Sequence, residues 1–197
     1  MLYLYISIGI LIAVVLLYLL FQNGKKASLK KVEWYKAWAF KMNLNHSAEK
    51  YLMAKLNTVS GTLEGCNFKI FEKITGSHHE SQYLHTFIHF EPSPFDFEFD
   101  ISRKSLGGKS NFELGDPTID DHFTFLTNDT AKFRALLTPD AINKLKLTSA
   151  FFGTGIKCDN EKLEHYYLGG LTKESQTEEL EAILNVMQAF IKAKKST

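Results

Sequence analysis

The chain has 197 residues, of which 45% are hydrophobic and 23% charged, and its formal net charge is +1. This length can bury the core of one soluble domain. The balanced charge, with no long basic stretch interleaved with aromatic residues, argues against nucleic acid as a partner. The two cysteines fit a reducing compartment but also permit one disulfide, so they do not fix the compartment.

Residues 2–21 form an uncharged, strongly apolar run. As a helix, this run would be roughly 30 Å long, which matches the hydrocarbon core of a bilayer, and it would satisfy its own backbone hydrogen bonds. A cleaved signal peptide is the alternative. However, no Lys or Arg precedes the run, the run is longer than a usual signal core, and no small-x-small cleavage site follows. We therefore expect residues 1–24 to be a single-pass transmembrane signal anchor.

Lysines follow this run on one side only. Residues 25–41 contain six lysines and one acid, Glu33. Lysines beside a membrane span favour the cytoplasmic face. We expect the N-terminus to lie outside and the soluble domain to be cytoplasmic.

Residues 25–45 are predicted to be a basic, aromatic juxtamembrane helix, separated from the anchor by Gln22-Asn23-Gly24. Apolar residues recur at helical spacing over 28–44. This helix either lies along lipid headgroups or packs on the soluble domain. In the first case the membrane-interface residues are Lys25, Lys26, Lys30, Lys31, Trp34 and Trp38.

Residues 46–197 are predicted to form one soluble α+β domain. An apolar period of two predicts strands over 58–62, 66–75, 83–90 and 95–102, with turns between them that include Gly76 to Glu80. A turn at Gly107-Gly108 and an acidic turn around Asp116, Asp120 and Asp121 follow, and a further strand begins at His122.

The second half of the domain contains helix caps. Asn128-Asp129 and Thr138-Pro139 are predicted to open helices over 130–137 and 139–145. Short strands follow between 148 and 168, interrupted by Gly153 and Gly155. Ser175 and Glu178 form a capping box that opens a last amphipathic helix. We expect an antiparallel sheet with one face covered by that helix, whose apolar side is Leu180, Ile183, Leu184, Met187, Phe190 and Ile191.

One segment resembles a known group of proteins. Residues 115–125, an acidic turn and strand, lead to Phe133-Arg134-Ala135-Leu136-Leu137-Thr138-Pro139. Over about residues 112–170 the chain resembles a loosely defined group of uncharacterised bacterial membrane-anchored proteins. Ile119 stands where an aromatic residue is expected. The resemblance implies a bacterial source and membrane attachment, and no activity.

The best candidate for chemistry is a predicted β-hairpin. If Phe90 pairs with Phe95 across Pro92-Ser93-Pro94, one face carries imidazoles and carboxylates at cross-strand distance. Such ligands suit a divalent metal ion, while a solvated face of paired charges is the alternative. The candidate metal ligands are His85, His89, Asp96 and Asp100.

Other motifs give no chemistry. Gly108-Lys109-Ser110 lacks the earlier glycine of a phosphate loop, and there is no Cys-x-x-Cys, Gly-x-Ser-x-Gly or His-Glu-x-x-His. The first functional hypothesis is therefore a membrane-anchored, non-catalytic interaction module: an adaptor, a complex subunit or an immunity-like protein. Its partners would be membrane lipid and another membrane or envelope protein, with no cofactor. The alternative is a metal-assisted hydrolase that uses the hairpin face.

Overall fold

The computed structural model describes residues 2–51, 54–76, 83–104, 110–148, 155–170 and 174–196, and of residues 2–10, 54, 174 and 175 it describes the backbone alone. Residues 77–80 of the predicted turn, Gly107-Gly108, Gly153 and the Ser175 side chain of the predicted capping box lie outside this description. The elements are α1 (Leu2–Lys41), β1 (Asn45–Tyr51), β2 (Ala54–Leu63), β3 (Cys66–Thr75), β4 (Tyr83–Phe90), β5 (Phe99–Arg103), α2 (Pro117–Asp120), β6 (Phe123–Thr127), α3 (Thr130–Leu136), α4 (Pro139–Thr148), β7 (Ile156–Cys158), β8 (Leu163–Leu168) and α5 (Glu174–Ser196).

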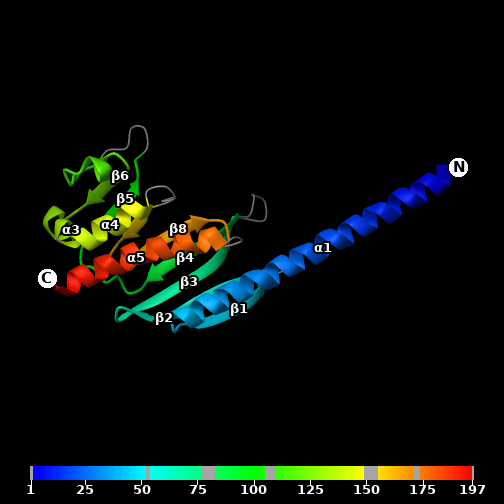
Figure 1. Ribbon diagram of the computed structural model, residues 1–197, viewed down its shortest axis with the longest axis horizontal. Coiled ribbons are helices and arrows are strands. Elements are labelled where there is room, and N and C mark those ends of the chain that lie inside the picture. Colours follow the sequence, from blue (N-terminus) through cyan, green and yellow to red (C-terminus); the bar gives the residue numbers. More distant parts are fainter. Residues whose placement is uncertain are drawn as a thin grey trace.

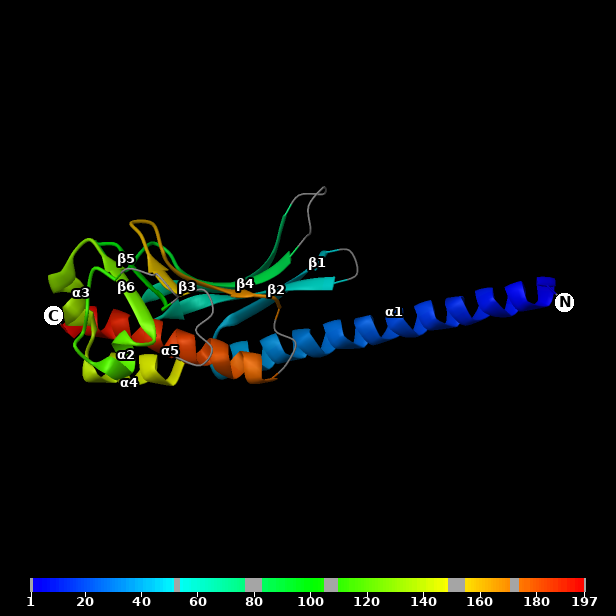
Figure 2. The same cartoon turned by 90° about the horizontal axis from the view of Figure 1, so that it is seen from above.

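The strands of the described residues form one eight-stranded antiparallel sheet in the order β1-β2-β3-β4-β8-β7-β5-β6. The helices α1, α4 and α5 lie on one side of this sheet, and none of the helices in the described residues lies on the other side (Figure 2). The predicted α+β architecture, with an antiparallel sheet and a C-terminal helix on one face, is confirmed. Strands β3 and β4 also have the predicted bounds.

Helix α1 is one continuous helix of 40 residues, so the predicted break at Gln22-Asn23-Gly24 is wrong. Glycine costs only about 1 kcal/mol in a helix and asparagine less, and neither removes a backbone donor as proline does. The helix ends where Asn43 adopts a left-handed conformation (φ 55°), which turns the chain into β1. In Figure 1, α1 runs beside β1 and β2 and then extends well beyond the sheet.

Among the described residues, no helix is both long enough and apolar enough to cross a membrane. This finding does not support the expected anchor at residues 2–21, of which residues 2–10 lie outside the described side chains.

The C-terminal part of α1 packs on the domain. Val32, Tyr35, Trp38 and Ala39 are buried, with exposed fractions from 1% to 7%, and α1 contacts β1 and β2. Residues 28–44 could lie along lipid headgroups or pack on the domain, and these buried residues of their apolar face pack on the domain.

A buried polar network joins α1 to the sheet. Lys31 Nζ lies 3.0 Å from Glu72 Oε1. The other carboxylate oxygen, Glu72 Oε2, accepts hydrogen bonds from the backbone N and the Nδ2 of Asn57, both at 2.9 Å. The Asn57 amide oxygen in turn lies 3.1 Å from Nε2 of His46 on β1. Burial and the nearby Glu72 carboxylate raise the pKa of Tyr35 well above its ordinary value. One helix and three strands are thus connected through a single carboxylate.

The hydrophobic core lies between the sheet and the helices. All six apolar residues predicted for the last helix are at most 2% exposed, so its buried face is confirmed. Phe133 of α3 is fully buried and lies 5.3 Å, ring centroid to ring centroid, from both Phe99 and Phe112. Aromatic contacts therefore hold α3 against the β5–β6 end of the sheet.

The predicted helix caps are also present. The Asp129 side chain accepts a hydrogen bond from the Lys132 amide (3.0 Å), and Thr138 Oγ1 accepts one from the Ala141 amide (3.3 Å). The acidic turn is held locally, because Asp120 accepts the amides of Leu114 and Gly115 at 3.0 and 2.8 Å. Asp116 accepts the Thr118 amide at 2.9 Å and pairs with Lys146 Nζ at 2.8 Å, so both of these carboxylates stabilise the turn.

A buried histidine predicts acid sensitivity. His165 is 3% exposed, its Nδ1 lies 2.6 Å from the Gly155 carbonyl oxygen, and burial lowers its pKa from 6.5 to about 4. Because the unfolded chain binds this proton more tightly, stability should fall as the pH drops from 6.5 towards 4, by on the order of 3 kcal/mol. Urea unfolding at pH 7 and pH 4 checks this. His165→Gln should remove this part of the pH dependence and His122→Gln, at an exposed position, should retain it; equal behaviour of the two variants would contradict the assignment.

Candidate binding face

We call the face of the sheet without helices the open face. Strand alternation determines which side chains lie on it. On β4, Thr86, Ile88 and Phe90 are buried beneath the helices, while His85, Phe87 and His89 point the other way and are half-buried. The predicted alternation within this strand is therefore correct. The pairing Phe71↔Phe87↔Tyr166 carries the same face from β3 through β4 to β8.

An aromatic patch lies in the middle of the open face. We define it as Phe71, His85, Phe87, His89 and Tyr166. The rings of Phe71 and Phe87 are stacked, 5.2 Å apart and inclined by 15°, and Tyr166 is 6.0 Å from Phe87. Both imidazoles are tilted or edge-on to Phe87. Tyr166 is 38% exposed. These are large apolar surfaces on a side of the sheet that no helix covers.

Charged side chains surround the patch. Lys69 Nζ lies 4.9 Å from the centroid of the Phe71 ring. The carboxylate of Glu164 is 2.7 Å from Lys162 Nζ and 3.1 Å from His89 Nε2. Burial, and then Lys162, lower the pKa of His89. Lys162 balances Glu164, and Lys69 and the neighbouring Lys73 outnumber Glu91, which lines the adjoining depression, so this part of the open face is on balance basic.

An open depression adjoins the patch. It measures about 480 Å³ and is lined by residues of β2, β3 and β4, including Ser60, Asn67, Lys69 and His89. Its lining offers both apolar and polar side chains.

The predicted hairpin between β4 and residues 95–102 is wrong. The neighbours of β4 are β3 and β8, so His89 pairs with Lys69 and Glu164, and His85 with Lys73 and Leu168. Strand β5 begins at Phe99 and pairs with β6 and β7. The prediction failed because Pro92-Ser93-Pro94 leads away from β4, and the Ser93 amide donates to the Glu161 carbonyl at 2.7 Å.

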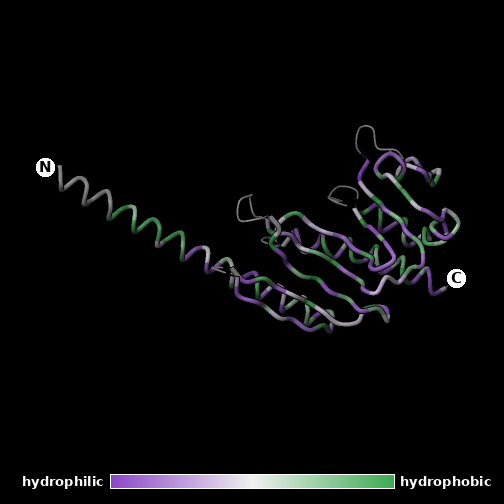
Figure 3. Tube along the Cα trace, turned by 180° about the vertical axis from the view of Figure 1, so that it is seen from behind, coloured by the Kyte–Doolittle hydropathy of each residue, from purple (hydrophilic) through white to green (hydrophobic). Residues whose placement is uncertain are grey.

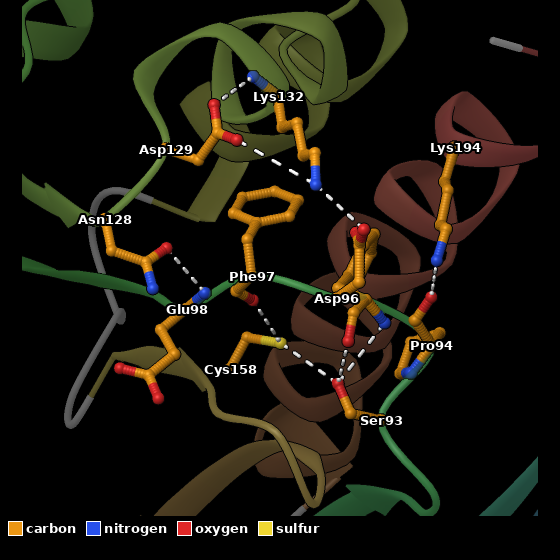
Figure 4. Close-up of polar contacts among 11 residues, drawn as sticks. Ser93, Pro94, Asp96, Phe97, Glu98, Asn128, Asp129, Lys132, Cys158 and Lys194 are labelled. Atoms are coloured by element: carbon orange, nitrogen blue, oxygen red, sulfur yellow. Dashed lines mark hydrogen bonds and ion pairs between the residues drawn. The ribbon is translucent and has the colours of Figure 1, made fainter.

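The four candidate metal ligands are therefore not brought together. His85 and His89 lie in the aromatic patch. Asp96 is an exposed loop residue that accepts a hydrogen bond from Lys132 Nζ at 2.8 Å, which lowers its pKa (Figure 4). Asp100 lies on β5, which is separated from β4 by two strands, β8 and β7. It lines a second depression of about 430 Å³ with Lys157 and Asp159, and burial raises its pKa. Across the described side chains, no group of three or more His, Cys, Asp and Glu residues is arranged to hold a metal ion.

Both cysteines are free thiols. Cys158 on β7 is buried, and its sulfur lies 3.3 Å from Ser93 Oγ and 3.7 Å from the Phe97 carbonyl oxygen (Figure 4). Burial raises the pKa of Cys158 to about 11. The thiol is therefore protonated at neutral pH, as in a structural cysteine.

The predicted membrane-interface residues have separate positions. Lys31 and Trp38 are buried within the domain, Trp34 is half-buried beside Trp38 and Thr177, and Lys25, Lys26 and Lys30 are exposed on α1 where it leaves the sheet.

Sequence reasoning did not single out three members of the aromatic patch, Phe71, Phe87 and Tyr166. A signal for Phe71 was present, because it lies between Lys69 and Lys73 on the polar side of an alternating strand. Tyr166 is adjacent to Tyr167, so alternation alone does not say which ring faces outward.

Comparisons with known proteins add no further evidence: no protein-family model, curated protein or solved structure matches the chain.

Proposed function

We propose that this protein is a membrane-tethered, non-catalytic binding module whose open face contacts a segment of another membrane or envelope protein. The observation that carries the proposal is the aromatic patch of β3, β4 and β8 on the side of the sheet without helices. Removing such rings from water favours association by about 25 cal/mol per Å² of apolar area.

The tether is proposed to be residues 2–21. The support is their uncharged, apolar sequence and the exposure of every described side chain from 11 to 21. In Figure 3, the coloured part of this apolar segment of α1 is hydrophobic and gives way to a hydrophilic part just before the sheet. The lysines that follow favour a cytoplasmic position for the domain.

Charge indicates the chemistry of the partner. Lys69 and Lys73 are exposed on β3, on either side of Phe71 along the strand. A partner segment with carboxylates spaced around an apolar or aromatic residue would complement both the lysines and the rings. We therefore propose an acidic protein segment as the ligand of the open face.

Site-specific photo-cross-linking in cells tests this proposal. Benzoylphenylalanine introduced at position 166 of the full-length protein should give an adduct with an acidic segment of a membrane protein, identified by mass spectrometry. Lys69→Glu should reduce the yield of that adduct by about tenfold, because it reverses the charge that faces the carboxylates. Lys36→Glu, a charge reversal at an exposed position of α1, should leave the yield unchanged.

The control for the position of the probe is residue 147. Leu147 is 73% exposed on α4, on the helix side of the sheet. Identical adducts from positions 147 and 166, or an adduct that does not respond to Lys69→Glu, would count against the open face as the binding surface.

The hydrolase alternative receives no support from the geometry. It required His85 and His89 to face Asp96 and Asp100 across one hairpin, and these strands are not neighbours.

A further inference from the structure

A like-charge pair lies at one end of the sheet. Lys50 of β1 is directly opposite Lys55 of β2, and the adjoining pair Tyr51↔Ala54 ends both strands. Like charges at such positions are destabilising. Their side chains lie on the face that α1 crosses, because Lys55 shares the alternation of Asn57 and Val59, which are buried on that face.

The buried network shows which segment of α1 lies beside Lys50 and Lys55. Asn57 is level with Lys31, since both bind the Glu72 carboxylate. Lys55 is two residues further along β2, roughly 7 Å towards the end of the sheet. The same displacement along α1 is roughly four to five residues. Lys50 and Lys55 are therefore level with the segment of α1 around Lys26 and Lys30.

Five lysines thus gather where α1 leaves the domain. We call Lys25, Lys26, Lys30, Lys50 and Lys55 the basic end. Four are exposed and Lys55 is half-buried. Within the described side chains, none of the five has an ion-pair partner among the salt bridges found, whereas Lys31 has Glu72. The described acids nearest in sequence are Glu33 and Glu49, and Glu49 lies on the opposite face, paired with Leu56. Among the described side chains of α1, β1 and β2 at this end, positive charge therefore predominates.

We propose that the basic end binds the phosphate-bearing headgroups of an anionic bilayer, with the β1–β2 hairpin as a second arm beside α1. Phe21, the last residue of the proposed anchor, is ten residues before Lys31, which is roughly 15 Å along the helix. Because Lys50 and Lys55 are displaced from Lys31 by roughly 7 Å in the same direction, they lie roughly 8 Å from Phe21 along the helix axis. This distance is comparable to the Debye length at physiological salt, within which the surface potential still acts. The inference rests on the proposed anchor, which would hold this end towards the bilayer.

The arrangement favours a lipid surface over one soluble anion. The five lysines come from two separate segments and extend across the end of the domain. Each lysine near an anionic surface strengthens binding by about fivefold. The spacing of many headgroups can match such a distribution, and the added negative charge offsets the repulsion between Lys50 and Lys55.

Lysine acetylation with peptide mass spectrometry tests the proposal on the full-length protein in lipid nanodiscs. With about 30% phosphatidylglycerol in phosphatidylcholine, the basic end should react about threefold more slowly than in phosphatidylcholine alone, and about 0.5 M NaCl should remove the difference. Lys41 and Lys194, at the other end of the domain, are the internal controls and should react equally in both lipids. Equal reactivity of the basic end in both lipids would overturn the inference, as would the same protection from inorganic phosphate in neutral nanodiscs.

The variant K50Q/K55Q distinguishes the contribution of the hairpin lysines to lipid binding from that of the α1 lysines. It removes the like-charge pair, so it should fold at least as well as the wild type, and the protection of Lys26 and Lys30 should decrease. Unchanged protection would show that the α1 lysines act alone and would overturn the second arm. Failure of the anchor is a distinct result, because the protein would then not co-purify with nanodiscs. Acetylation would in that case be repeated with anionic vesicles, where unprotected lysines again overturn the inference.

Discussion

Replacing Glu72 with alanine should lower the free energy of unfolding by about 3–5 kcal/mol, because removal of one partner leaves a buried charge uncompensated. The Glu72 side chain is fully buried and that of Lys31 is only 10% exposed. The substitution would also remove the acceptor of two hydrogen bonds from Asn57. Urea unfolding of the full-length protein in detergent, followed by the fluorescence of Trp34 and Trp38, measures the loss.

The matched control is Glu181→Ala. Glu181 of α5 pairs with Lys41 of α1 at 3.2 Å, but the side chains of Lys41 and Glu181 are 66% and 31% exposed. Exposed pairs contribute less than about 1 kcal/mol. If Glu72→Ala cost no more than Glu181→Ala, the buried network would not be what holds α1 on the sheet.

The second large effect is expected from Phe133→Ala, at about 3–5 kcal/mol, through loss of buried apolar surface and formation of a cavity. Phe133 is fully buried, and its ring is also 5.8 Å from that of Phe125. Thermal unfolding followed by circular dichroism measures this loss. Leu147→Ala, at a 73% exposed position of the neighbouring helix α4, should change stability little. Similar losses for the two variants would contradict the position of Phe133 at the centre of this cluster.

Local periodicity and capping chemistry predicted the parts of the fold that depend on local sequence. The buried face of α5, the alternation of β4 and the cap at Asp129 each depend on residues a few positions apart. Strand β1 was not predicted, because its sequence, Asn-His-Ser-Ala-Glu-Lys-Tyr, has almost no apolar alternation and it lies at the edge of the sheet. An edge strand with one partner needs little apolar surface.

The strand order was not predictable from local signals. Prolines at 92 and 94 between two alternating segments are typical of a turn, but backbone contacts with the β7–β8 connection direct the chain elsewhere. The candidate metal site failed for this reason, since it required one specific pairing. The aromatic patch and the basic end likewise combine residues that only the sheet brings together, such as Phe71 with Tyr166 and Lys30 with Lys55.

The continuity of α1 constrains how a partner can approach. Strand β2 and the second half of α1 run side by side, and the Lys31–Glu72 contact prevents the helix from turning independently of the sheet. With residues 2–21 across a bilayer, as we propose, the strands would run roughly perpendicular to the membrane. The open face would then be directed along the membrane surface and not towards it. Rotation of the anchor about its own axis would then turn the open face towards different neighbours in the membrane. Its partners would then be proteins held at the same height in the same membrane, which would meet it by lateral diffusion in two dimensions.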